Sequence, residues 1–246
     1  MNNKYILVLV EGEKTEINFF NNISNVFFKQ NHNIEIIPFK CNIYKLYKHI
    51  ESYNFNIDLI DALLTTKNIS NEEKNILINK RFFYKYLVFD FDIQHKFLDN
   101  DIKYKSLLKM KEYFSNESEN GLLFLNYPMF ESIKVELSNP PLKYFYSNKN
   151  EYKKHINEKI NININNLVYD EILNLIRKSI IIGNYIVKRQ FHIPKYEDLQ
   201  DIIFNNKILI HQISCFKNYK CVYQLNTSIL FLISYFGEKL FNKIKS

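Results

Sequence analysis

The chain has 246 residues, 46% of them hydrophobic and 16% aromatic, which allows a full hydrophobic core and excludes an intrinsically disordered protein. Its formal net charge of +7 favours an anionic partner only weakly, because just three of the basic residues are arginines. The three cysteines, Cys41, Cys215 and Cys221, form no paired framework, and the apolar run 229–233 is far shorter than the roughly 20 residues of a membrane helix. With no leading signal peptide, we expect a reduced, cytoplasmic protein without a membrane partner.

The first part of the chain alternates strand and helix patterns. Residues 4–10 begin with Lys4 and continue as an apolar run to Val10 that is too short for an ordinary helix and rich in β-branched residues, which predicts a strand buried on both faces. Helical spacing follows over 16–30, a second strand is expected at 34–39, and a second helix at 42–53. A charged helical stretch at about 55–83 is interpreted as an insertion at the rim of the sheet.

The same alternation continues with strands expected at 86–89 and 121–125 and a helix over 102–114 between them. This order predicts an α/β fold in which a small parallel sheet is flanked by helices and joined by right-handed crossovers. We therefore expect the acids that follow the strands to meet at the carboxyl edge of the sheet, where open α/β sheets hold their ligands.

A strong turn signal, Ser138-Asn139-Pro140-Pro141, predicts a domain boundary. We expect a catalytic domain over residues 1–137 and a mainly helical region over 142–246. Three apolar helices are predicted in that region, at 169–191, 196–216 and 222–244. Any surplus apolar face on them would mark a partner interface or a homodimer contact.

Carboxylates stand directly after two of the predicted strands. Glu11 follows the first strand, and Asp90 and Asp92 end a later one, where strand alternation would turn both side chains to the same face. Carboxylates held this close repel each other unless a cation lies between them, and Mg²⁺ or Mn²⁺ is suited to oxygen ligands. The alternative is a helix-capping aspartate beside a solvated one.

Three motifs in order resemble the Toprim family. The stretch Val10-Glu11-Gly12 through Thr15-Glu16 is similar to the opening of Toprim proteins of the OLD and RloB-like families, and Asp90-Phe91-Asp92 matches their DxD. Asn126-Tyr127-Pro128-Met129-Phe130-Glu131 is similar to the NPxFE stretch of RloB-like proteins, with a tyrosine inserted after the asparagine. The glycine that often follows DxD in Toprim proteins is absent here, and Ile93-Gln94-His95 stands in its place.

The resemblance implies a Toprim-like Rossmannoid fold and a catalytic set of Glu11, Asp90, Asp92 and Glu131. Glu11 would act as general acid/base or metal ligand, Asp90 and Asp92 as ligands, and Glu131 as a further acid for a second ion; Glu16 is an additional metal candidate. Alternatively, Glu131 is a surface glutamate at a helix start and Glu16 is a first-turn helix acid, both stabilised by the helix dipole. One or two Mg²⁺ or Mn²⁺ ions would be bound.

Cations close to aromatic residues provide candidate nucleic-acid contacts. Lys14 stands beside Gly12, and the stretch from Tyr144 to His155 interleaves rings with lysines, among them Lys149, Tyr152, Lys153 and Lys154. The alternative for this stretch is a solvated face with its rings turned into the core. His95 is either a proton shuttle or an exposed residue.

Taken with the resemblance, these residues lead us to expect a Mg²⁺-dependent nuclease that hydrolyses phosphodiester bonds, with tRNA-like RNA favoured over DNA. The Toprim effectors of PARIS anti-phage systems imply a toxic role in abortive infection under the control of a partner ATPase. One alternative is a non-catalytic Toprim-fold module that binds metal or a partner. Another is a housekeeping Toprim ribonuclease or DNA nuclease.

Overall fold

The computed structural model describes residues 5–28, 33–93, 99–145, 149–159 and 162–245. Contacts between residues divide the chain into two units, which we describe in turn. The first unit comprises residues 1–89 and 96–123, and the second comprises residues 90–95 and 124–246. The domain boundary predicted at residues 138–141 stays a prediction.

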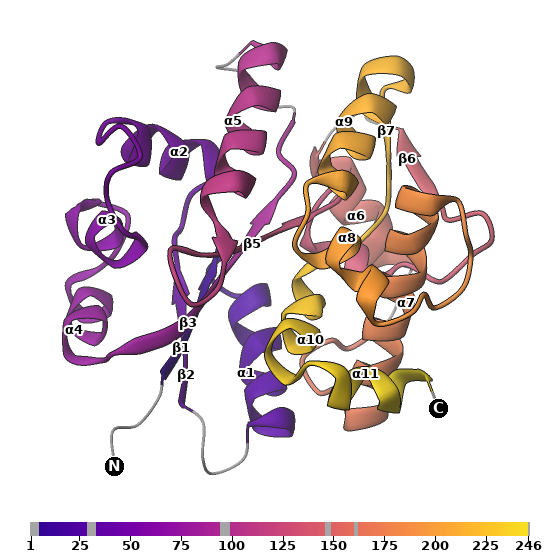
Figure 1. The fold of residues 1–246 in the computed structure, drawn as a ribbon, viewed down its shortest axis with the longest axis horizontal. Coiled ribbons are helices and arrows are strands. Elements are labelled where there is room, and N and C mark those ends of the chain that lie inside the picture. The colour runs from indigo at the N-terminus through magenta and orange to yellow at the C-terminus, as the bar shows by residue number, and fades with distance from the viewer. Residues whose placement is uncertain (1–4, 29–32, 94–98, 146–148, 160–161, 246) are drawn as a thin grey trace. The chain divides into compact units, whose positions relative to one another are not determined.

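A five-stranded sheet in the order β2-β1-β3-β5-β4 organises the first unit (Figure 1). The strands are β1 (Tyr5–Val10), β2 (Asn33–Pro38), β3 (Phe82–Asp90), β4 (Ser115–Asn116) and β5 (Gly121–Asn126). Strand β1 pairs in parallel with both β2 and β3, and the two-residue β4 pairs antiparallel with β5. The predicted α/β fold with a mostly parallel sheet is confirmed.

The central strands are the apolar runs that the sequence marks. Residues 6–10 of β1 and all of β5 are buried, as expected for strands covered on both faces. Strand β5 begins at Gly121, whose φ of +126° is a backbone conformation that residues with a side chain rarely adopt. A Cβ at this position would also lie only 2.6 Å from Cδ1 of Leu87. Glycine therefore lets β5 start close against β3.

Five helices accompany this sheet in the described part of the first unit. They are α1 (Thr15–Phe27), α2 (Ile43–Glu51), α3 (Leu59–Thr65), α4 (Asn71–Asn79) and α5 (Asn100–Tyr113). The helices predicted at 42–53 and 102–114 are confirmed as α2 and α5, and the helix predicted at 16–30 is confirmed as α1, which ends at Phe27; residues 29–30 lie outside the described residues. The predicted insertion contains α3 and α4. A capping box between Ser70 and Glu73 begins α4, and β3 starts at Phe82, earlier than predicted.

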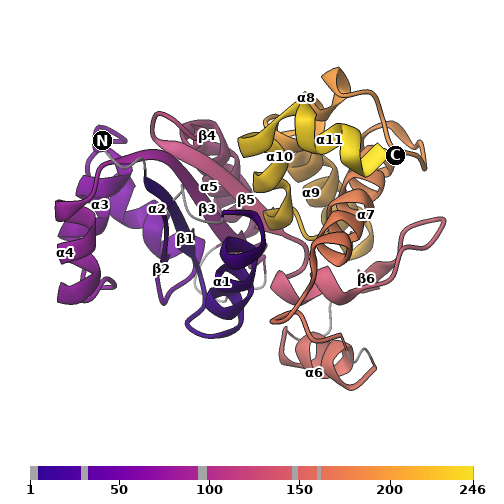
Figure 2. The ribbon, with the colours of Figure 1, turned by 90° about the horizontal axis from the view of Figure 1, so that it is seen from below.

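The second unit combines helices, which Figure 2 labels, with a small antiparallel sheet. Its helices are α6 (Lys149–Lys159), α7 (Tyr169–Lys188), α8 (Gln200–Ile203), α9 (Lys207–Tyr219), α10 (Phe231–Phe236) and α11 (Glu238–Lys245). The described residues of this unit also form three 3-10 turns: η1 (Phe130–Lys134), η2 (Glu197–Leu199) and η3 (Ser228–Leu230). The sheet pairs β6 (Lys143–Phe145) with β7 (Cys221–Tyr223), two three-residue strands that the sequence analysis missed.

Two of the three predicted C-terminal helices are broken, which corrects the expectation for 196–216 and 222–244. The first of them consists of η2, α8 and α9, and α9 ends where Lys220 adopts a left-handed conformation with φ of 54°. The segment predicted as a helix over 222–244 instead starts within strand β7. It is interrupted again at Gly237, whose φ of 62° separates α10 from α11. The helix predicted over 169–191 is confirmed as α7.

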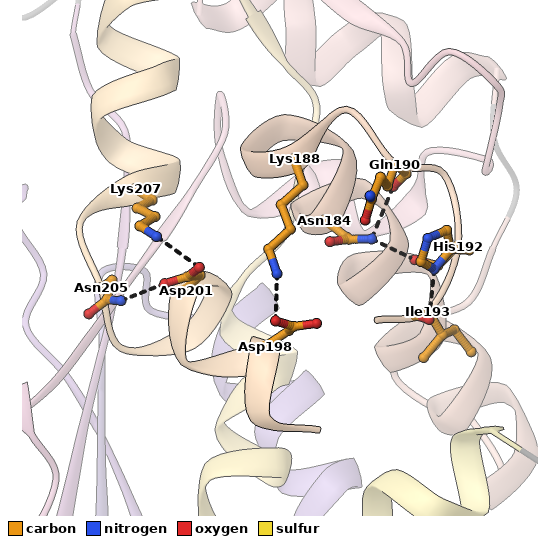
Figure 3. A network of polar contacts seen from close by, with 9 residues as sticks. All are labelled: Asn184, Lys188, Gln190, His192, Ile193, Asp198, Asp201, Asn205 and Lys207. Carbon is orange, nitrogen blue, oxygen red and sulfur yellow. Dashed lines mark hydrogen bonds and ion pairs between the residues drawn. The ribbon is translucent and has the colours of Figure 1, made fainter. Parts of the chain in front are cut away.

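Polar contacts connect the helices of the second unit (Figure 3). Lys188 on α7 pairs with Asp198 at 2.6 Å, and Lys207 on α9 pairs with Asp201 at 2.8 Å. The carboxamide of Asn184 donates to the carbonyl oxygens of Gln190 and His192, which fixes the loop that follows α7. None of the helices in the described ranges has both the length and the apolar character that a membrane span requires.

Candidate functional site

Glu11 lies where β1 meets β3 in the first unit. Val10 is in register with Val88, and the N–H of Glu11 donates to the carbonyl oxygen of Val88 at 3.0 Å. Glu11 is half-buried and directly follows the last residue of β1. Its backbone is thus fixed at the carboxyl end of a central strand, which is the position that the sequence predicts.

Glu16 folds back over the turn that follows Glu11. A Cβ added at Gly12 would collide with the Glu16 carboxylate, so the absence of a side chain at position 12 lets this carboxylate approach the backbone. Lys14 is exposed at the start of α1. Glu16 therefore lies against the Glu11–Gly12 turn rather than on an open helix face.

Asp90 is the last residue of β3 and is buried, with only 7% of its surface exposed. Its Oδ1 accepts the N–H of Phe130, 40 residues further along the chain, at 2.8 Å. This bond satisfies the first N–H of η1, so Asp90 has a structural role as an N-terminal cap as well as being a candidate ligand.

Asp92 departs from the geometry that the sequence analysis assumed. Strand β3 ends at Asp90, and the N–H of Asp92 donates to the carbonyl oxygen of Asp90 at 2.9 Å. Strand alternation therefore stops before Asp92 and does not set the direction of its side chain. Asp92 is half-buried, in contrast to Asp90. His95 lies outside the described residues.

Glu131 is held in η1 and is buried, with its side chain only 6% exposed. Its Oε1 lies 2.9 Å from Nζ of Lys153, whose side chain is 53% exposed. The alternative of a surface glutamate at a helix start is contradicted by this burial. A buried carboxylate needs a compensating charge or hydrogen bonds, and here a cation from α6 supplies the charge.

Tyr152 lies beside both buried carboxylates. Burial raises the pKa of its phenol well above the usual range, and the charges of Glu131 and Asp90 raise that pKa further. The phenol donates to Oε1 of Gln224 at 2.8 Å, and the ring packs against Tyr144 with 4.5 Å between ring centroids. Because Tyr152 is only 1% exposed, its ring cannot stack on a nucleic-acid base. The nucleic-acid role expected for Tyr152 is therefore wrong, and its ring is turned into the core, as the alternative expected.

The other predicted nucleic-acid contacts on α6 lie in different surroundings. Lys153 pairs with Glu131, whereas Lys154 is exposed and lies 3.8 Å from Glu158, one turn along the helix. The side chain of Lys149 lies outside the described residues. The stretch is therefore neither a continuous cationic surface nor wholly solvated.

A polar segment near the C-terminus completes this part of the second unit and was missed from the sequence. Oδ1 of the fully buried Asn126 accepts the N–H groups of Thr227 and Ser228, at 3.1 and 3.2 Å. The carboxamide of Asn226 donates to the carbonyl oxygen of Phe130 at 3.1 Å. A signal was present, because polar residues 224, 226, 227 and 228 interrupt an otherwise apolar stretch.

Comparison of the chain with models of protein families, with curated proteins and with solved structures gives no match. The resemblance to Toprim proteins accordingly rests on the three motifs quoted above and stays a prediction.

The donor set is compatible with a divalent cation. Asp90 and Glu131 are buried carboxylates that act on the same phenol, and oxygen ligands of this type suit Mg²⁺ and Mn²⁺. In the structure, the ammonium of Lys153 provides the positive charge at Glu131 that such an ion would otherwise provide. The Lys153 side chain is largely exposed. Within the described ranges, no three His, Cys, Asp or Glu side chains are grouped closely enough to hold a metal. Asp90 and Glu131 thus fit as part of a ligand set that needs further donors.

Proposed function

We propose that the protein is a divalent-metal-dependent nuclease that hydrolyses phosphodiester bonds. Asp90 and Glu131 would form the centre of the metal site, and Glu11 and Asp92 would complete it. The observation that carries the proposal is the burial of two carboxylates from segments 40 residues apart, joined through the bond from Phe130 N–H to Asp90. Burying two like charges near one phenol is unfavourable without a cation, and a metal site supplies a functional reason for it.

Glu11 and Asp92 enter the proposal through their positions on the chain. Glu11 follows β1, whose neighbour in the sheet is β3, and Asp92 follows β3 by two residues. A bound divalent ion would polarise a phosphate oxygen and lower the pKa of a bound water. Glu16, folded back over Gly12, is a further oxygen donor on the same turn as Glu11.

The chain's own groups would assist this chemistry in different ways. With its raised pKa, the Tyr152 phenol remains protonated at neutral pH and serves as a hydrogen-bond donor, so it is not a general base. Its bond to Gln224 fixes its orientation. Lys153 can leave Glu131 through solvent and would then pair with a substrate phosphate.

The substrate and the biological setting follow from the resemblance to RloB-like and PARIS Toprim proteins. On that basis we extend the proposal to tRNA-like RNA as the substrate and to a toxic anti-phage effector held inactive by a partner ATPase. A homodimer through the C-terminal helices is part of the same proposal.

A non-catalytic module is the second candidate, and one observation favours it. Each buried carboxylate has a partner in the chain itself, Phe130 N–H for Asp90 and Lys153 for Glu131. The cluster can therefore exist without an ion, as a purely structural element would. Under this alternative the fold would bind a metal ion or a partner without turnover.

A cleavage assay separates the two candidates. The protein is incubated with total tRNA and with plasmid DNA, in Mg²⁺, Mn²⁺ or EDTA, beside Glu131→Gln, Asp90→Asn and Glu11→Gln. The nuclease proposal expects metal-dependent cleavage that each substitution lowers by about 100-fold or more. The matched control Glu158→Gln removes an exposed carboxylate of α6 and should cleave like the wild type.

Circular dichroism and thermal melting establish that each variant is folded. Folded wild-type protein that binds Mn²⁺ in calorimetry but cleaves neither substrate would support the module. RNA cleavage that survives in all three variants and in EDTA would refute the metal site.

A further inference from the structure

Cations and aromatic rings alternate along one part of the second unit. The guanidinium carbon of Arg189 lies 5.5 Å from the ring centroids of both Tyr185 and Tyr223. Nζ of Lys143 lies 4.9 Å from the centroid of Tyr223 and 5.6 Å from that of Tyr219. The resulting order, Tyr185, Arg189, Tyr223, Lys143 and Tyr219, is called the cation–aromatic ladder below.

Several elements of the second unit build this ladder. Arg189 is the left-handed residue that ends α7, with φ of 59°, and its Nη1 donates to the phenol of Tyr223 at 2.9 Å. The adjoining loop is held by Asn184 (Figure 3). Lys143 on β6 is directly opposite Tyr223 on β7 in the antiparallel pair. Backbone pairing between β6 and β7 and the C-terminal cap of α7 thus fix the backbone positions of Lys143, Tyr223 and Arg189.

One end of the ladder presents large aromatic surfaces to solvent. Tyr219, at the end of α9, is 65% exposed, and so is Phe145, two residues from Lys143 on the same face of β6. Exposed rings of this size grouped beside cations are unusual on a surface without a binding role.

The stretches of chain that carry these rings are basic. No Asp or Glu occurs from residue 202 to residue 237, or from 137 to 150, whereas these stretches contain five lysines, of which Lys207 pairs with Asp201. They include β6, β7 and all of α9, the elements that carry Lys143, Tyr223 and Tyr219. On α7, the nearby Lys188 is already paired with Asp198. Lys143 and Arg189 therefore provide positive charge that could bind a polyanion.

We propose that the cation–aromatic ladder, together with Phe145, binds single-stranded RNA. Bases would stack on the exposed rings of Tyr219 and Phe145, and phosphates would pair with Lys143 and Arg189. A single strand fits better than a duplex because only unpaired bases expose their faces for stacking. A protein partner fits less well, because lysines are depleted at protein interfaces and β6, β7 and α9 contain no Asp or Glu to accompany them.

This inference deepens the proposed nuclease function, on which it rests, by naming a surface that grips the substrate. It places the rings that stack on bases outside the α6 stretch, because Tyr152 is buried there.

The experiment is an RNA-binding titration with the full chain in EDTA, where metal-dependent cleavage cannot interfere. Fluorescence anisotropy is read on a labelled single-stranded uridine oligonucleotide and on an RNA duplex of equal length. We expect tighter binding of the single strand, with Tyr219→Ala and Phe145→Ala each weakening it about tenfold. Lys143→Gln should reduce the slope of log K against log salt by about one.

Matched controls use exposed residues of the first unit. Tyr53→Ala removes a ring that is 42% exposed, and Lys67→Gln removes an exposed lysine; both should bind like the wild type. Thermal melting of every variant shows that any lost affinity is not a loss of folding.

The ladder proposal is overturned if Tyr219→Ala and Phe145→Ala bind RNA as the wild type does, or if the wild type binds neither oligonucleotide. It is also overturned if sedimentation shows a dimer that these substitutions dissociate, because the face would then join two copies of the chain. Failure of the nuclease proposal looks different. In that case RNA binding through the ladder persists, but no metal yields cleavage.

Discussion

The ammonium of Lys153 lies 2.9 Å from Oε1 of Glu131, so a largely exposed cation neutralises a buried carboxylate. The two partners are not equivalent. The lysine side chain is 53% exposed and can move into water, whereas the glutamate side chain is 6% exposed and stays buried. A metal ion at Glu131 would therefore have to displace only the lysine.

Replacing that lysine should strengthen metal binding. In Lys153→Met an incoming ion no longer competes with an ion pair worth about 1 kcal/mol, so Mn²⁺ should bind about three- to tenfold more tightly in calorimetry. Without metal, the variant should melt at a lower temperature because Glu131 loses its partner. Lys154→Met, which removes a lysine paired only across an exposed turn, is the control. Unchanged or weaker Mn²⁺ binding in Lys153→Met would argue that the pair is purely structural.

Loss of the Asn126 side chain should destabilise the second unit. Asn126→Ala leaves the buried N–H groups of Thr227 and Ser228 without their acceptor, a loss of about 2–4 kcal/mol in unfolding free energy. Urea denaturation measures this. Asn205→Ala, which removes an exposed side chain bonded to Asp201, should lose less than about 1 kcal/mol. Equal losses in the two variants would contradict the role assigned to Asn126.

Stability should depend on pH through Lys111 of α5. Burial lowers the pKa of this lysine from 10.5 to about 7, and Nζ donates to the carbonyl oxygen of Leu123 at 2.6 Å. Between these two pKa values the unfolded chain holds more protons than the folded one. The contribution of Lys111 to the unfolding free energy therefore rises as pH increases from about 7 to 10.5. Below pH 7 this contribution does not change with pH.

The test compares thermal unfolding of wild type and Lys111→Met across this pH range. The stability of the variant relative to wild type should be greatest near pH 6 and should decrease towards pH 10, by about 1.4 kcal/mol for each pKa unit lost to burial. Lys105→Met, an exposed lysine on the same helix, should follow the wild-type profile. A difference between Lys111→Met and wild type that stays constant with pH would contradict the lowered pKa.

Two thiols of the second unit should form a disulfide on mild oxidation. Sγ of Cys215 on α9 lies 3.4 Å from Sγ of Cys221 on β7, and a small side-chain movement brings them to bonding distance. Treatment with diamide should lower the intact mass by that of two hydrogen atoms. Cys41→Ser should behave in the same way, whereas Cys215→Ser should not change in mass. Disulfides found only between molecules would show that α9 and β7 are not paired as described.

The positions along the chain of the central strands, and of Glu11 and Asp90 at their ends, could be predicted from the sequence. Residues 5–10, 86–89 and 121–125 contain no charged side chain and, apart from tyrosine hydroxyls, no polar one, which is typical of strands buried on both faces of a sheet. Glu11 and Asp90 follow from the same signal, because an acid directly after a buried strand must lie at the end of that strand. Local periodicity carries this information and needs no knowledge of distant contacts.

Contacts between distant segments were decided only by the tertiary structure. The bond from Phe130 N–H to Asp90, the pairing of Lys153 with Glu131 and the acceptance of Thr227 N–H by Asn126 join residues 22 to 101 positions apart. Spacing along the chain does not reveal which polar groups will be buried together. Burial is determined by how whole elements pack, and this is why only the structure shows that Tyr152, either a nucleic-acid contact or a core ring by its sequence, is a core residue.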